Sequence, residues 1–386
     1  MAASLLPALG CGGASDQPEA TAPTGLGEPT AAFADDFGTI QTVRELPDGR
    51  VLVADPLARA LYLVDMDAGT RTVVGSEGAG PGEYLQPDAV WPLPGDSTLL
   101  VDLGNGRLVA LGPDLSFGST MPIAQGDPSL RGGLVLALPQ GVDRRGRVYA
   151  SGRGSSFGAQ APDSGAILRF DRGIRTIDTV GAYKVMGQIR TVSPGSGGRG
   201  ISIRQIPLSL EDAWGVAPDG SVAVARGPAY LVQWLAPDGS VTTGPPIPFE
   251  DLRIGTAEKE EWASESSRVA GLRMSVTISG GVTETNLSRG GGGRGNIDLD
   301  QYEWPDLLPP FHPGRLPIDP LDRAWVRRHV GAGRAAIYDV FDRGGERVRT
   351  IELGRDRVVI GFGEGTVYVV AYDEFDLNYL ERYAMP

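Results

Sequence analysis

Four acidic side chains stand where short apolar runs begin, and their carboxylates could bind a metal ion. They are Asp88, Glu211, Asp212 and Asp356. If the runs are the inner strands of a closed β-structure, these carboxylates lie near the mouth of its central channel. Oxygen ligands of this kind suit Ca²⁺. The alternative is that each side chain accepts hydrogen bonds from backbone N–H groups at its own strand entry.

A second set of candidate residues is cationic and falls in or beside the connections between consecutive strands. Its members are Arg59, Arg107, Arg153, Arg226, Arg328 and Arg334. A ring of guanidinium groups would suit an anionic ligand, such as a carboxylate-rich or sugar-phosphate partner. Because arginine is used heavily throughout the chain, the alternative is that these are solvated loop cations.

The chain has few other residues that could bind a metal ion or a ligand. The chain has two histidines, His312 and His329, and one cysteine, Cys11. A zinc site built from His and Cys is therefore not expected. Aromatic residues Trp262, Tyr302 and Trp304 could stack on a sugar, or they could pack their own segment against the rest of the protein.

A repeated pair of short β-type runs, joined by a tight turn, would position these residues. The turn recurs six times, near Gly49, Asp96, Gly146, Gly220, Asp322 and Gly365. With a strand before each pair and one after most pairs, the unit is a four-stranded antiparallel blade. We therefore predict an all-β fold, a six-bladed β-propeller over residues 33–386. Residues 32–40 would supply the outer strand of the last blade and close the ring, which removes open sheet edges.

One unit resembles an NHL repeat. The stretch "GSEGAGPGEYLQPDAV…LLVDLGNGRLVALGPD" has a Gly-rich connector, the pair Glu83-Tyr84, Pro87, and Val101 followed by a D-x-x-N-x-R run from Asp102 to Arg107. "PAYLVQWLAPDG" and "LPPFHPGRLPID" are similar to a family of bacterial six-bladed propeller lipoproteins. The resemblance implies the fold and leaves the function open, because propellers host many unrelated activities.

The topology of such blades places short turns on one face and every long segment on the other. The long segments are 75–87, 124–133, 152–164, 181–210, 246–313 and 328–333. Because loops on a rigid scaffold commonly carry function, we predict that the long-loop face holds the binding site. The insertion before blade five, about residues 247–312, contains a predicted helix over 256–274 with Thr256 as N-cap. It is either a lid over the channel or a decoration with no ligand role.

The composition and the N-terminus limit the possible partners and the cellular location of the protein. The net charge of -13 is unsuited to sequence-independent binding of nucleic acid. The start "MAASLLPALGCGGASDQPEA" resembles the end of a bacterial lipoprotein signal with Cys11 as the lipidated residue. That resemblance implies a signal remnant over 1–11, a flexible tether over 12–32, and a lipid anchor on the periplasmic or extracellular side. The alternative is an ordinary terminus with a chance cysteine.

Two classes of function follow. The first is a non-enzymatic binding or scaffolding propeller that recognises a protein, peptide or glycan with its long-loop face, with no nucleic-acid partner. The second is a calcium-dependent hydrolase or lyase similar to paraoxonases or gluconolactonases. The lack of a catalytic His–acid pattern favours the first. We expect a monomer and no cofactor, with calcium left open.

The anchor leads to a testable prediction. When the chain is expressed in bacteria with radioactive palmitate, we expect the label to enter the wild-type protein. The label should be lost in Cys11→Ser because the thiol that carries the lipid is gone. Equal labelling of the two proteins, or no labelling of either, would contradict the lipoprotein hypothesis.

Overall fold

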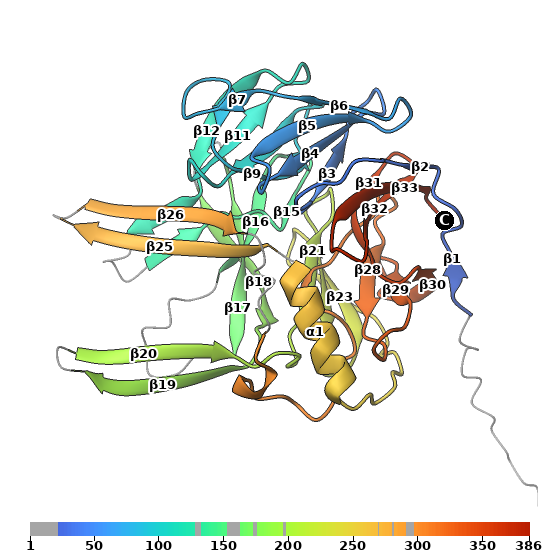
Figure 1. The fold of residues 1–386 in the computed structure, drawn as a ribbon. Helices are drawn as coiled ribbons and strands as arrows, with labels where there is room; N and C mark the ends of the chain where they lie inside the picture. The colour runs from blue at the N-terminus through green and yellow to red at the C-terminus, as the bar shows by residue number, and fades with distance from the viewer. Residues whose placement is uncertain are drawn as a thin grey trace, which may run out of the picture.

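The computed structural model describes residues 22–127, 133–152, 163–172, 176–195, 198–268, 270–279, 282–290 and 297–386. In these ranges the chain forms a six-bladed β-propeller of four-stranded antiparallel sheets with a single α-helix (Figure 1). The predicted fold class is confirmed. None of the helices in this part of the chain is long and apolar enough to cross a membrane. Cys11 and Arg153 lie outside the described residues.

Each blade runs from an inner strand at the axis to an outer strand at the rim. Blade one consists of β3 (Val43–Glu45), β4 (Val51–Asp55), β5 (Ala60–Asp65) and β6 (Thr70–Val73). Blade two consists of β9 (Pro87–Pro92), β10 (Thr98–Asp102), β11 (Arg107–Leu111) and β12 (Phe117–Pro122). Blade three consists of β15 (Gly141–Val142), β16 (Val148–Gly152), β17 (Ser164–Phe170) and β18 (Ile177–Lys184). Blade four consists of β21 (Ala213–Val216), β22 (Val222–Arg226), β23 (Leu231–Leu235) and β24 (Val241–Thr243). Blades five and six contain β28 (Ala324–Arg328), β29 (Ala336–Phe341) and β30 (Arg347–Leu353), and β31 (Arg357–Gly363), β32 (Thr366–Tyr372) and β33 (Asn378–Ala384).

Blade five has an irregular inner strand. Ile318 bridges Ala324 of β28. Just before it, β27 (Gly314–Arg315) runs parallel to β21 of blade four. The chain that enters blade five therefore lies between two blades and carries Arg315 to the axis.

The six predicted hairpin turns share one backbone feature. The residue predicted at each turn has a left-handed conformation: φ is 84° at Gly49, 55° at Asp96, 75° at Gly146, 92° at Gly220, 60° at Asp322 and 72° at Gly365. Glycine adopts this conformation at little cost, and aspartate tolerates it better than most residues. The turn chemistry seen in the sequence therefore identified each inner hairpin.

The core consists of the interfaces between blades. Buried apolar residues of the described chain form six clusters, one for each neighbouring pair of blades. Strand β4 is buried along its whole length, because a blade packs on both of its faces. One pair from each interface is Leu52 and Val90, Leu99 and Val148, Tyr149 and Trp214, Val232 and Phe341, Tyr338 and Val367, and Val53 and Val370.

The N-terminal segment closes the ring, as predicted, but it begins earlier. Strand β2 (Ala31–Ala32) pairs with β33 as the outer strand of blade six, and Phe37 N–H donates to the Asn378 carbonyl at 2.9 Å. Strand β1 (Thr24–Gly25) runs parallel to β30 of blade five. The predicted tether over 12–32 therefore needs correction, because open edges of blades five and six pair with the chain from Thr24 onward.

The long-loop face carries additional elements. They are β7 (Ser76–Glu77) with β8 (Glu83–Tyr84), β13 (Ala124–Asp127) with β14 (Gly133–Leu136), β19 (Gln188–Gly195) with β20 (Gly198–Gln205), α1 (Thr256–Arg268), β25 (Gly271–Ser279) with β26 (Val282–Gly290), and η1 (Leu299–Gln301). In Figure 1 the hairpins β19–β20 and β25–β26 project to the left of the ring. The predicted helix was too long, because Gly271 disfavours a helix and the consecutive β-branched residues Val276, Thr277 and Ile278 favour a strand.

Ring closure can be tested at Phe37, which is buried between blades six and one. Replacing it with alanine should lower the free energy of unfolding by about 3–5 kcal/mol, through lost burial and a residual cavity. Urea denaturation measures this loss.

The matched control is Phe375→Ala, because that ring is 60% exposed. It should change the free energy of unfolding by less than about 0.5 kcal/mol. Equal effects of the two substitutions would mean that the N-terminal segment does not hold the ring closed.

Candidate functional site

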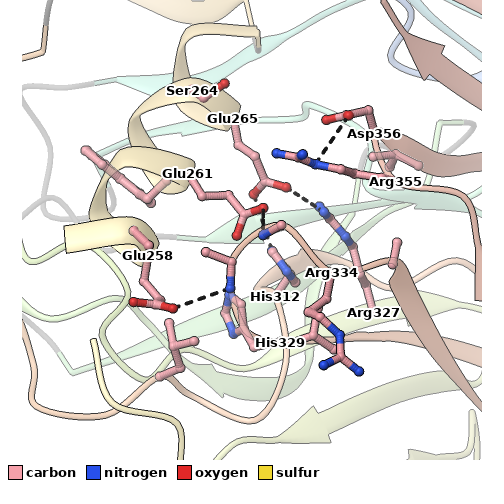
Figure 2. A pocket seen from close by; sticks show the side chains of 18 of the residues that line it. Glu258, Glu261, Ser264, Glu265, His312, Arg327, His329, Arg334, Arg355 and Asp356 are labelled. Atoms are coloured by element: carbon pink, nitrogen blue, oxygen red, sulfur yellow. Dashed lines mark hydrogen bonds and ion pairs between the residues drawn. The ribbon is translucent and has the colours of Figure 1, made fainter. Parts of the chain in front are cut away.

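A cavity of about 590 Å³ lies beneath α1 on the long-loop face (Figure 2). Its wall comes mainly from α1, from the end of the insertion at Leu308 and His312, from residues 327–336 between the end of β28 and the start of β29, and from residues 355–358 at the start of β31. The predicted location of the binding site therefore contains a cavity in which α1 forms the roof over blades five and six.

The roof helix has no buried residue, and polar contacts join it to the propeller. Its Glu258 accepts from the N–H of Gly255 at 3.0 Å, which satisfies a donor before the first turn and lowers the pKa of Glu258. Four further contacts join α1 to the propeller: Glu258 with the N–H of Ala332 at 3.4 Å, Glu261 with the N–H of Gly333 at 3.2 Å, Glu265 with Arg327 at 2.5 Å, and Arg268 with Asp356 at 2.6 Å.

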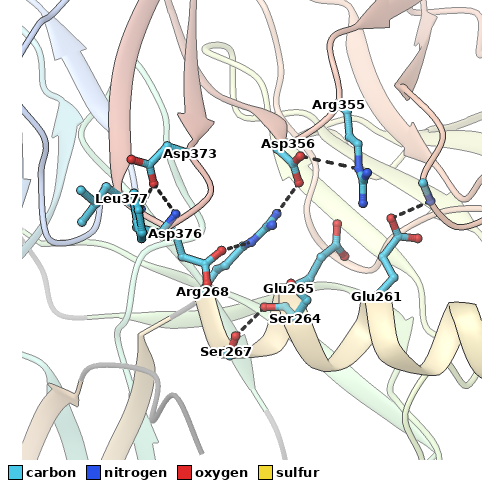
Figure 3. A network of polar contacts seen from close by, with 12 residues as sticks. Glu261, Ser264, Glu265, Ser267, Arg268, Arg355, Asp356, Asp373, Asp376 and Leu377 are labelled. Carbon is cyan, nitrogen blue, oxygen red and sulfur yellow. Dashed lines mark hydrogen bonds and ion pairs between the residues drawn. The ribbon is translucent and has the colours of Figure 1, made fainter. Parts of the chain in front are cut away.

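Arg268 anchors the C-terminal end of α1 (Figure 3). Its guanidinium bridges Asp356 at 2.6 Å and Asp376 at 2.7 Å and lies over the ring of Tyr372, 5.3 Å from its centroid. Burial works against the charge of Arg268, but the two carboxylates outweigh it and raise the pKa of Arg268 above its ordinary value. A cation near the last carbonyls also suits the helix dipole.

Both histidines of the chain meet on the floor of this cavity. The rings of His312 and His329 are 3.8 Å apart and tilted by 37°. His312 Nδ1 lies 3.9 Å from a Glu265 oxygen, and His329 Nδ1 lies 2.9 Å from the Pro309 carbonyl. Because a carbonyl only accepts, Nδ1 of His329 carries the proton and Nε2 is left as an acceptor.

Both imidazoles are neutral near pH 7. Burial lowers the pKa of His329 to about 4, and the charge of Arg327 adds to this, while the bond to Pro309 opposes it. Burial and the charges of Arg327 and His329 hold the pKa of His312 well below its ordinary value. The 24% of the His312 side chain that stays exposed is available to a ligand in the cavity.

Charge on the cavity wall is divided between its two sides. The helix contributes Glu258, Glu260, Glu261 and Glu265, together with Arg268, which is paired with Asp356 of the propeller side. The propeller contributes Arg327, Arg328, Arg334, Arg355 and Arg357. Within the described chain, Arg334 forms no ion pair and the buried Nε of Arg327 has no hydrogen-bond partner, so the propeller side retains donors.

The predicted acids do not converge. Asp88 is buried and paired with Arg289 of β26, whose Nη2 lies 2.9 Å from it. Asp212 accepts from the N–H groups of Lys184 and Gly227 and pairs with Arg226, and Asp356 pairs with Arg268. Glu211 is buried next to Asp212. Among the described residues, no group of three His, Cys, Asp or Glu side chains could hold a metal ion.

Four of the six predicted arginines are paired with carboxylates. Arg107 pairs with Asp102 and donates to the carbonyls of Ala79 and Glu83, which fixes the connector between the first two blades. Arg59 pairs with Glu77 at the surface, Arg226 with Asp212, and Arg328 with Asp339. Arg328 and Arg334 also line the cavity. Anion binding by this set stays a prediction.

The insertion aromatics mainly pack against each other. Trp262 meets Tyr302 and Trp304 edge-on, with centroids 5.2 Å apart in both pairs. Lys259 lies over Trp304. Trp262 alone of the three also lines the cavity. Packing is therefore the observed role of Tyr302 and Trp304.

Sequence reasoning missed Glu265, Arg268, Arg327 and the two histidines as site residues. One signal was available: "LPPFHPGRLPID" and "RAWVRRHVGAG" each carry a histidine where a blade-five strand meets a long loop. These two stretches pair, since His312 N–H donates to the Arg327 carbonyl and His329 N–H to the Pro310 carbonyl.

No protein-family model matches the chain, and no curated protein matches it. Several solved structures are similar. An exported protein from Bacteroides fragilis is 10% identical with a TM-score of 0.44, over 92% of each chain. Regucalcin, a calcium-binding protein from Agrobacterium tumefaciens, is 13% identical with a TM-score of 0.36, over 92% of this chain and 96% of that one. Virginiamycin B lyase from Staphylococcus aureus is 9% identical with a TM-score of 0.38, over 91% and 98%. These similarities are too low to transfer an activity, a ligand or a cofactor.

The neutral histidines predict how stability changes with pH. The pKa of His329 is about 4 in the folded protein and 6.5 in the unfolded chain. Between these values only the unfolded chain takes up the proton, so acid favours unfolding. Between about pH 7 and pH 5, His329 should remove about 2 kcal/mol from the free energy of unfolding.

The variant His329→Asn keeps an N–H for Pro309 and cannot take up that proton. Urea denaturation at the two pH values should show a loss smaller by about 2 kcal/mol than in the wild type. His312→Asn should change the loss in the same direction. Identical pH dependence in wild type and His329→Asn would contradict the neutral pair.

Proposed function

We propose that the protein is a non-enzymatic binding propeller of the cell envelope whose ligand is a short peptide, held in the cavity beneath α1. The size of the cavity supports a small ligand, because pockets of about 300–1,000 Å³ are typical of such sites. A folded protein partner would be expected to bind a flat face of the packed blades and not a cavity of this size.

The division of charge across the cavity carries the proposal. A short peptide is a zwitterion: its amino group suits the glutamates of α1, and its carboxylate suits the arginines of the propeller. Arg327 and Arg334 have donors that the described chain leaves unused. A guanidinium binds a carboxylate through two parallel N–H groups. The neutral histidines add polar contacts without adding charge.

An enzyme acting in the same cavity is a second candidate, favoured by one observation. The Nε2 atom of His329 is an unprotonated acceptor that could take a proton from a substrate or a water molecule. Binding ranks first because a base with a pKa of about 4 is weak near pH 7. Hydrolysis of trialanine by the wild-type protein and not by His329→Asn would establish the second function.

Envelope anchoring through Cys11 is a separate part of this proposal. It is supported by the resemblance of Ala8–Cys11 to a lipoprotein signal. Cys11 is thirteen positions before the first strand that pairs with the propeller, at Thr24. The intervening chain would hold the propeller close to a membrane surface.

The binding proposal is tested by filling the cavity. Ser264 lies on the cavity side of α1, and Ser264→Trp should occupy the space beneath the helix. Calorimetric titration with trialanine should give binding to the wild type and at least about tenfold weaker binding to Ser264→Trp, because the ligand would be sterically excluded.

The control is Ser266→Trp, which places the same side chain on the same helix at an exposed position outside the cavity wall. It should bind trialanine like the wild type. Trialanine with acetylated and amidated termini should bind at least about tenfold more weakly, because it lacks both charges. No binding of trialanine to the wild type, or equal effects of the two tryptophans, would contradict the proposal.

A further inference from the structure

A second cavity, of about 250 Å³, lies on the propeller axis at the short-turn face. The inner strands of five blades and the irregular inner segment of blade five contribute to its wall; one residue from each blade is Val43, Trp91, Val142, Val216, Ile318 and Ile360. Pro218 and Pro320, which belong to short turns, lie at the same end. This cavity is therefore the end of the central channel opposite to the long loops.

Arg315 of β27 crosses this channel. Its backbone belongs to the inner edge of blade four, where it pairs with Trp214. Its Nη2 donates to the Ile360 carbonyl of blade six at 2.6 Å. Its guanidinium also lies 5.5 Å from the centroid of Trp91 in blade two. Contacts with blades on different sides of the axis place the charged group at the centre of the channel.

The charge of Arg315 lacks a counter-ion in the described chain. No described carboxylate forms an ion pair with it, and one carbonyl accepts from its five N–H groups. Burial lowers the pKa of Arg315 to about 10, so the guanidinium still carries its proton near pH 7. An isolated charge in such a place is costly unless another charge compensates it.

The carboxylate among the residues that line this cavity, that of Asp319, is already engaged. Asp319 accepts from Nε of Arg323 at 2.7 Å, from the indole of Trp325 at 2.9 Å, and from the N–H of Leu321 at 3.0 Å. A second cation, the exposed Arg144, lines the mouth of the channel. The channel therefore has an excess of positive charge in a protein whose net charge is -13.

We propose that the short-turn end of the channel binds a small carboxylate, which forms a two-pronged contact with the guanidinium of Arg315. A planar guanidinium fork matches the two oxygens of a carboxylate. The ring of Trp91 lies against a face of the guanidinium, so the N–H groups at its edge that do not donate to Ile360 remain for the ligand. Arg144 at the mouth attracts the anion electrostatically. This site is independent of the peptide site beneath α1.

Thermal unfolding with sodium acetate as the probe, at constant ionic strength, tests this site. A ligand that binds only the folded protein raises the melting temperature as its concentration rises. Acetate should raise it in the wild type and in Arg349→Met, whose guanidinium is exposed on β30 away from the channel. It should have no effect in Arg315→Met. The effect should persist in Ser264→Trp, which separates this site from the cavity beneath α1.

Several outcomes would overturn the proposal. They are no rise in the wild type, an equal rise in Arg315→Met, and a rise with sodium phosphate but none with acetate. If Arg315→Met does not fold, Arg315→Lys replaces it. Lysine keeps the charge and loses the planar fork, so the acetate affinity should fall at least about tenfold, and an unchanged affinity would overturn the fork geometry.

Discussion

The candidate site depends on one ion pair, which the guanidinium of Arg327 forms with a carboxylate from outside its own blade. Arg327 is on β28, and its carboxylate partner is Glu265 of α1, at 2.5 Å. Because α1 buries none of its residues, contacts of this kind are what hold it over blades five and six. Without them, the two histidines and the arginines beneath α1 would face solvent, where their pKa values and affinities would be ordinary.

The two ends of the axis use arginine differently. Toward the long-loop face, the guanidinium groups of Arg268, Arg327 and Arg328 are paired with carboxylates, and they organise a roofed cavity. Toward the short-turn face, Arg315 lies in the channel and has no carboxylate partner among the described residues. The ion pairs of these arginines are structural, whereas guanidinium N–H groups that no group of the described chain accepts remain available to a ligand.

Features that local interactions determine could be predicted from the sequence, whereas features that depend on residues far apart in the sequence could not. The hairpins were predictable, because the left-handed residues at Gly49 and Asp96 are local turn chemistry. Asp88 was correctly placed at a strand entry, but its partner Arg289 is 201 residues away on an insertion that crosses the ring. No local pattern encodes that contact. The histidine pair required knowing that residues 310–312 align with 327–329, which only the irregular register of blade five decides.

Hydrogen exchange of the α1 backbone tests the central claim most directly, since it reports local opening of the roof. The exchange of α1 amides should be slow in the wild type. In Glu265→Gln, which leaves Arg327 without its counter-ion, exchange across α1 should be at least about tenfold faster, while the strands of blades one and two stay unchanged. Unchanged exchange of α1 in Glu265→Gln would show that this ion pair does not hold the roof, and it would contradict the account.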